Sequence, residues 1–99
     1  MTTVGLIVEL EAKSGKEEEL AAFLRSAVPL VEAEPATSAW FALQTGESSF
    51  AIVDAFPDDS GRQAHLNGPV AVALLAKADE LLASAPVIKP VDVLADVLR

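Results

Sequence analysis

Apolar residues fall into four short β-rich runs along this chain, and two helical segments separate them. The first run is apolar on both strand parities until Glu9, which predicts a strand covered on both faces with one end reaching water. The second and third runs are separated by a loop with Gly46 and predict a hairpin. Pro90 places the last run at a sheet edge or a bulge. The four runs are Val4–Ala12, Thr37–Thr45, Ser49–Phe56 and Val87–Leu98.

The two helical segments repeat their apolar positions every three to four residues. The first follows a loop near Gly15 and keeps this spacing from Leu20 to Val31, with Pro29 predicting a kink or an end. The second spans Val70–Ala83 and is apolar on most sides. A turn or short helix over residues 57–66 precedes it, and Asn67 is expected to cap its start.

The predicted order is β-α-β-β-α-β in one domain over residues 1–99, with α+β fold class. This is the ferredoxin-like pattern: an antiparallel four-stranded sheet with two helices on one face. Nothing in this layout covers the other face, although Ile7, Val53 and other residues of that parity are apolar. An uncovered apolar sheet is a liability in water, so we expect a homodimer that pairs sheet face to sheet face.

Composition removes several classes of function. The 15 acidic and 7 basic residues give a net charge of −8, which disfavours nucleic-acid and membrane-surface partners. The chain has no cysteine and one histidine, so thiolate catalysis and multi-histidine metal sites within one chain are excluded. The first residues lack the basic start of a signal peptide, and a cytoplasmic location is expected.

Two ionisable residues are candidates for chemistry. His65 is the only side chain whose ordinary pKa, about 6.5, lies near neutral pH, although it could instead simply fix the connector before the last helix. Asp54 lies on an apolar strand and must be paired, at a sheet edge or functionally perturbed; Arg62 and Lys89 are its possible ion-pair partners.

Trp40 is the only tryptophan, and it shares a strand face with Ala42 and Gln44. The small alanine beside the large ring leaves space for a flat ligand, or else it relieves crowding in a core. Asn67 is a helix cap or a hydrogen-bond donor to a ligand.

Three segments together resemble the antibiotic biosynthesis monooxygenase-like family of dimeric α+β barrel proteins. They are LVEAEPATSAWFAL (residues 30–43), AIVDAFPDD (residues 51–59) and RQAHLNGPVAVAL (residues 62–74). The resemblance implies oxidation of a quinol-like or polyketide-like aromatic by O₂ without a metal, flavin or other cofactor. By the resemblance, His65 matches the family's histidine beside the pocket mouth and could accept a phenolic proton. We therefore take His65 and Asp54 as candidate catalytic residues. The candidate substrate-binding residues are Trp40, Gln44, Asn67 and Phe56.

Two other functions stay open at this point. A dimeric module could bind a small apolar ligand without turnover. A haem-degrading relative would need His65 as axial ligand, but the acidic chain has few cations for the haem propionates. The chain also lacks tyrosine, which excludes any mechanism that uses a tyrosyl hydroxyl.

Overall fold

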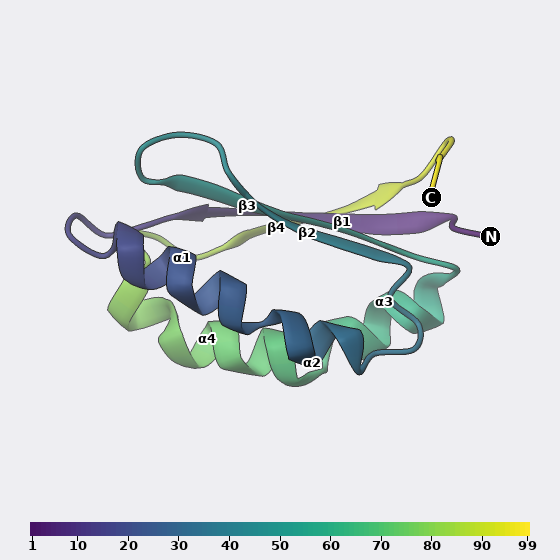
Figure 1. The fold of residues 1–99 in the computed structure, drawn as a ribbon, viewed down its shortest axis with the longest axis horizontal. Helices are drawn as coiled ribbons and strands as arrows, with labels where there is room; N and C mark the ends of the chain where they lie inside the picture. The colour runs from purple at the N-terminus through teal and green to yellow at the C-terminus, as the bar shows by residue number, and fades with distance from the viewer.

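A computed structural model describes all residues, 1–99, and shows one layer of helices beneath one sheet (Figure 1). The four strands are antiparallel in the order β2-β3-β1-β4. The strands are β1 (Val4–Glu11), β2 (Ala39–Gln44), β3 (Ser49–Phe56) and β4 (Val87–Asp92). This confirms the predicted α+β, ferredoxin-like sheet.

Four helical segments cover the same face of the sheet. The first predicted helix is divided at Ala27, two residues before Pro29, because proline cannot continue the hydrogen bonding of a helix interior. The short helix expected before the last long helix is present. The segments are α1 (Glu17–Ser26), α2 (Val28–Glu32), α3 (Asp59–Leu66) and α4 (Pro69–Leu81).

The core lies between the helices and the inward-facing side chains of β1 and β3. Leu6, Leu20 and Phe56 are its largest completely buried residues. Around them, β1 and β3 pair in register along their full lengths, so that Leu6 lies opposite Asp54. Gly5, on the other face, allows these strands to approach closely: a Cβ there would lie 2.5 Å from the Asp54 carbonyl oxygen. Asp54 thus lies on a central strand, with its side chain on the face that the helices cover.

The opposite sheet face has no covering layer within the chain (Figure 1). Phe41, Leu43 and Val87 expose 57%, 43% and 49% of their surface there. The last segment, residues 93–99, leaves the sheet after β4 and lies above this face. The prediction of a strand to Leu98 is wrong, because pairing with β1 stops at Asp92 opposite Val4.

Candidate functional site

The single histidine is buried between two carboxylates. His65, on α3, lies with Nδ1 2.7 Å from Glu34 Oε1 and with Nε2 3.1 Å from Asp54 Oδ2. The Asp54 side chain has no exposed surface, and the Glu34 side chain is 15% exposed. We call Glu34, His65 and Asp54 the carboxylate–histidine network. It joins the exit of α2, helix α3 and the central strand β3.

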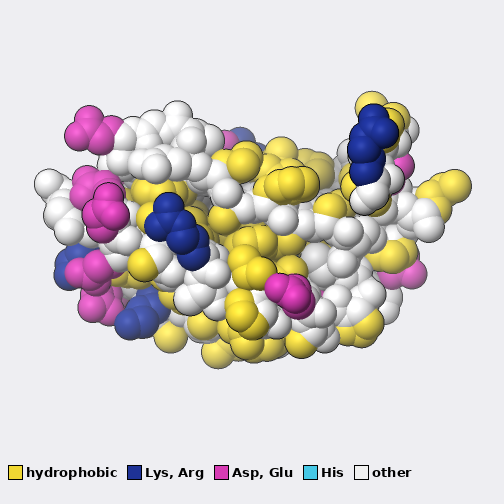
Figure 2. Space-filling model, in the orientation of Figure 1, with side chains coloured by type: hydrophobic (Ala, Val, Ile, Leu, Met, Phe, Trp, Pro, Cys, Tyr) yellow, Lys and Arg dark blue, Asp and Glu magenta, His cyan; other side chains and the backbone are white.

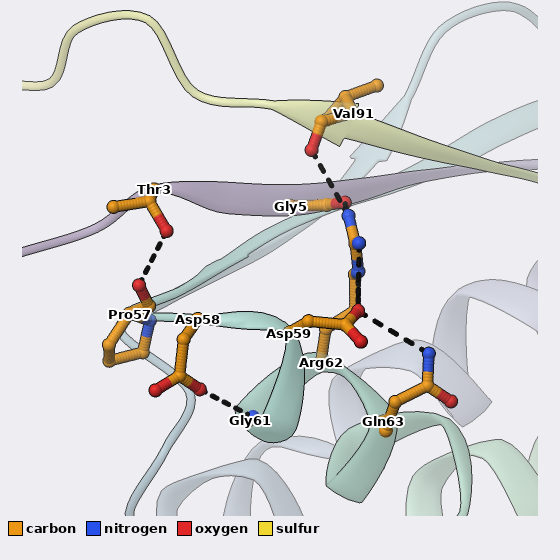
Figure 3. Close-up of polar contacts among 9 residues, drawn as sticks. All are labelled: Thr3, Gly5, Pro57, Asp58, Asp59, Gly61, Arg62, Gln63 and Val91. Carbon is orange, nitrogen blue, oxygen red and sulfur yellow. Dashed lines mark hydrogen bonds and ion pairs between the residues drawn. The ribbon is translucent and has the colours of Figure 1, made fainter.

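Polar contacts at its first turn hold α3 in the position that this network requires (Figure 3). Asp58 caps the helix by accepting a hydrogen bond of 3.0 Å from the Gly61 amide. Arg62 then donates from Nη1 to the backbone oxygens of Gly5 on β1 and Val91 on β4, each at 3.3 Å. The helix is therefore tied to two strands one turn before its buried histidine.

Glu34 is held by more than the histidine. Its Oε1 also accepts a 2.7 Å hydrogen bond from Thr37 Oγ1. Its Oε2 lies near the start of α4, since a Cβ on Gly68 would be 3.4 Å from it. The partial positive charge of a helix N-terminus favours a carboxylate there. Glu34 Oε2 and both oxygens of Asp54 nevertheless lack a hydrogen-bond donor, because the His65–Asp54 contact is not aligned as a hydrogen bond.

The environment sets the charge of the imidazole. Burial by itself lowers the pKa of His65, but the contacts of its ring with the carboxylates of Asp54 and Glu34 outweigh this effect, and its pKa is raised above 6.5. The two carboxylates therefore favour the protonated, cationic form of the imidazole. In that form both ring nitrogens carry protons, Nδ1 donating to Glu34 and Nε2 lying close to Asp54, so the free proton-accepting atoms of the network are carboxylate oxygens.

Two cavities meet at Trp40, which lies opposite Asp54 in the β2–β3 register. The first, about 340 Å³, lies between α1 and β2 and has Trp40, Ala42, Gln44 and Arg25 in its wall; we call it the α1–β2 cavity. The second, about 290 Å³, has both Trp40 and Glu34 in its wall. The buried Nε1 of Trp40 has no hydrogen-bond acceptor in the chain. The indole therefore lies at the boundary between an apolar cavity and the network.

The structure brings most of the predicted site residues into two groups. His65, Asp54 and Phe56 form one, with the Phe56 and His65 ring centroids 5.4 Å apart. Trp40 and Gln44 form the other, in the wall of the α1–β2 cavity. Phe56 has no exposed surface and packs in the core beside the imidazole, so in this structure it contacts the histidine and lines no open cavity.

Two expectations for individual residues are wrong. Asp54 pairs with His65, because Arg62 is bound to Asp59 and to backbone oxygens. Lys89 points to Glu9 on the sheet's other side. 

Asn67 does not cap the start of α4. It ends α3 and donates its side-chain amide to the Gln63 carbonyl at 2.9 Å, while Gly68 takes the cap position without a side-chain bond. Because α3 and α4 are separated by only Asn67 and Gly68, Asn67 caps the C-terminal end of α3.

Sequence reasoning missed Glu34, Thr37 and Arg25. Glu34 and Thr37 flank the Pro35 break, and an acidic residue in such a break looks like an ordinary solvated loop residue. Their chemistry appears only when the chain folds, since Glu34 meets a histidine 31 positions away. No group of three or more potential ligand side chains is arranged to hold a metal ion.

Comparison with solved structures defines the class of fold first. A candidate antibiotic biosynthesis monooxygenase from Caulobacter crescentus matches with a TM-score of 0.81 at 18% identity, over 95% of this chain and 92% of that one. PA3566 from Pseudomonas aeruginosa matches with a TM-score of 0.82 at 24% identity, over 96% and 97%. The chain thus has the fold of the antibiotic biosynthesis monooxygenase-like proteins, as the sequence motifs predicted.

A much nearer relative gives the family. NE2512 from Nitrosomonas europaea, a protein of unknown function, is 56% identical, with a TM-score of 0.98 over 100% of this chain and 96% of that one. This chain belongs to the same family as NE2512. No family model matches the sequence, and no curated protein does.

Proposed function

We propose that this protein is a small cofactor-independent monooxygenase that oxidises a quinol-like or polyketide-like aromatic with O₂. The observation that carries the proposal is the meeting at Trp40 of an apolar cavity and a buried, charged acid–base network. The cavity volume of about 340 Å³ suits a ligand of one or two fused rings. Ala42 supplies the space beside the indole that a flat ring needs.

The reaction balances without a cofactor. A phenol with a free para carbon and one O₂ give a para-quinone and one water: one oxygen atom enters the ring, and the other leaves with the ring hydrogen and the hydroxyl proton. A quinol with a free ring carbon, such as menadiol, and one O₂ give a hydroxyquinone and one water: one oxygen atom becomes the new hydroxyl, and the other leaves with two hydrogens of the substrate. The aromatic substrate supplies the electrons. What the protein must do is hold the ring, take up the phenolic proton and keep water away from the oxygenated intermediate.

Within this proposal the proton goes to the network and not to His65 acting alone. The raised pKa of His65 favours the protonated imidazole, which has no lone pair left to accept a proton. Glu34 is the network member in the wall of the cavity that Trp40 shares. We assign Glu34 as proton acceptor, with His65 and Asp54 holding its charge and position.

Oxygen consumption tests this function. The purified chain should consume O₂ with menadiol faster than menadiol autoxidises, and Glu34→Gln should reduce the enzymatic rate by roughly a hundredfold, as loss of a general base does. Glu47→Gln, an exposed acidic residue of the β2–β3 turn, is the matched control and should keep the full rate. A Glu34→Gln variant that is folded and fully active would refute the assignment.

A non-catalytic binding module is the second candidate, and one observation favours it. Glu34 Oε2, Trp40 Nε1 and both Asp54 carboxylate oxygens are all closed to solvent, as expected for a network that only stabilises the fold. A binder would change the fluorescence of Trp40, the chain's only tryptophan, on adding a quinone, with no oxygen uptake above background.

We further propose that the chain is a cytoplasmic homodimer, paired through the uncovered sheet face. Exposed Phe41, Leu43 and Val87 support the pairing. None of the helices has the length and apolar character that a membrane span requires. Sedimentation velocity at micromolar protein should give a dimer mass. Val53→Glu, in the centre of that face, should give monomers, whereas Val72→Glu on the exposed side of α4 should not. Cell fractionation tests the location.

A further inference from the structure

The α1–β2 cavity has a cation in its wall that no acidic side chain neutralises. Arg25 lies in the last turn of α1, is exposed and lines the cavity. The remaining wall is mostly apolar, with Leu24, Val28 and Trp40 among its residues. A guanidinium beside an apolar cavity presents several N–H donors in a fixed plane, which suits a carboxylate.

The lack of a partner for Arg25 is unusual in this chain. Acidic residues exceed basic ones by 15 to 7, and nearly every cation is engaged. Four of the seven pair with a carboxylate and a fifth, Lys13, donates to a backbone oxygen. The four pairs are Lys16–Glu19, Arg62–Asp59, Lys77–Glu80 and Lys89–Glu9. Apart from Arg25, only Arg99 at the end of the chain has no such partner.

Charged and hydrophobic side chains also lie in different parts of the molecular surface. Hydrophobic side chains form a band across the middle of the face shown in Figure 2, while the acidic side chains gather mainly toward the end where α1 begins. The acidic first turn of α1, Glu17–Glu19, lies at the opposite end of the helix from Arg25. The cavity therefore opens beside a positive charge in an otherwise acidic protein.

The other polar groups of the cavity wall are less available than Arg25. Trp40 Nε1 is buried without an acceptor and is closed to solvent. The amide nitrogen of Gln44 donates one of its two N–H groups to the Glu47 carbonyl at 3.3 Å. Arg25 is thus the one charged donor in the wall, and no carboxylate lies in this wall to receive its N–H groups. A ligand that suits this wall therefore has an anionic hydrogen-bond acceptor attached to an apolar ring.

We propose that the α1–β2 cavity binds an aromatic carboxylate, whose ring lies in the apolar part and whose carboxylate pairs with Arg25. This rests on the proposed function in taking the cavity as the substrate site, and it narrows the substrate class from neutral quinols to aromatic acids. Arg25 is then the residue that selects a negatively charged substrate over a neutral one.

Two probes of equal shape test the proposal: 2-naphthoate and its uncharged counterpart 2-naphthamide. Calorimetric titration of the full chain should give about tenfold tighter binding of the acid, as expected for a hydrogen-bonded ion pair. The single indole N–H resonance of Trp40 should shift with both probes. Equal affinities for the two, or no binding of either, would overturn the proposal.

Substitution of Arg25 assigns the preference to one residue. Arg25→Gln should lose about tenfold in affinity for the acid and none for the amide, and Arg25→Lys should restore part of the loss because it keeps the charge. Arg99→Gln, the other unpaired cation, is the matched control and should change neither affinity. An unchanged preference in folded Arg25→Gln overturns the proposal.

These outcomes stay separate from the oxygenase test. Binding is measured without turnover, so a chain that consumes no O₂ can still show the charge preference. Conversely, a chain that oxidises menadiol and binds both probes equally would keep the proposed reaction and refute the role of Arg25.

Discussion

The two regions on either side of Trp40 have opposite polar character. In the carboxylate–histidine network the unused atoms are acceptors: Glu34 Oε2 and the oxygens of Asp54. In the α1–β2 cavity the unused groups include the N–H donors of Arg25. The network is buried and places one imidazole between two carboxylates, whereas the cavity has an exposed cation and apolar walls. Substitutions in the network should therefore change stability, and substitutions in the cavity should change binding.

Removal of the histidine is expected to give the largest effect. His65→Ala leaves two buried carboxylates without their shared cation, which should lower the free energy of unfolding by about 3–5 kcal/mol. Urea unfolding measures it. The double variant His65→Ala/Asp54→Asn should recover part of the loss, because it removes one of the stranded charges. Equal stabilities of wild type and His65→Ala would show that the network contributes nothing.

Removing the charge of Glu34 should lower the free energy of unfolding by less than the loss of His65 does. Glu34→Gln keeps the shape of the side chain and one acceptor oxygen but loses the charge, so we expect about 1.5–3 kcal/mol, the value of a hydrogen bond to a charged group. The same urea experiment applies. Glu47→Gln should be unchanged within about 0.5 kcal/mol, as usual for surface positions.

The network should also make stability depend on pH. Because the pKa of His65 is raised in the folded state, its contribution is fully present below the unfolded value of about 6.5 and is lost as pH rises through the folded pKa. The urea midpoint should fall as the pH rises from about 6.5 through the folded pKa of His65. In His65→Gln this fall should be absent, and an identical fall in that variant would assign it to other groups.

The smallest effect on stability is expected in the cavity. Ala42 is exposed, so Ala42→Leu should change unfolding free energy by no more than about 0.5 kcal/mol. The larger side chain should nevertheless fill space beside Trp40 and weaken 2-naphthoate binding. Retention of full affinity in Ala42→Leu would place the ligand elsewhere.

The order of strands and helices followed from local pattern. Period-two runs, a glycine-containing hairpin loop, the break near Pro29 and the edge position of Pro90 are signals that a few neighbouring residues determine. These features also predicted that Trp40 and Gln44 share a face, because side chains alternate along a strand. The two now lie in one cavity wall.

Partner choice was decided by the tertiary structure. Asp54 had to be paired, but sequence could not select His65 over Arg62, because α3 packs so that the long arginine reaches backbone oxygens on two strands while the shorter histidine points inward. Glu34 completes the network only because the α2 exit folds against α3. The sequence alone determined which elements form, since propensity and periodicity are local; the folded chain determined which charges meet, because those distances depend on packing between distant elements.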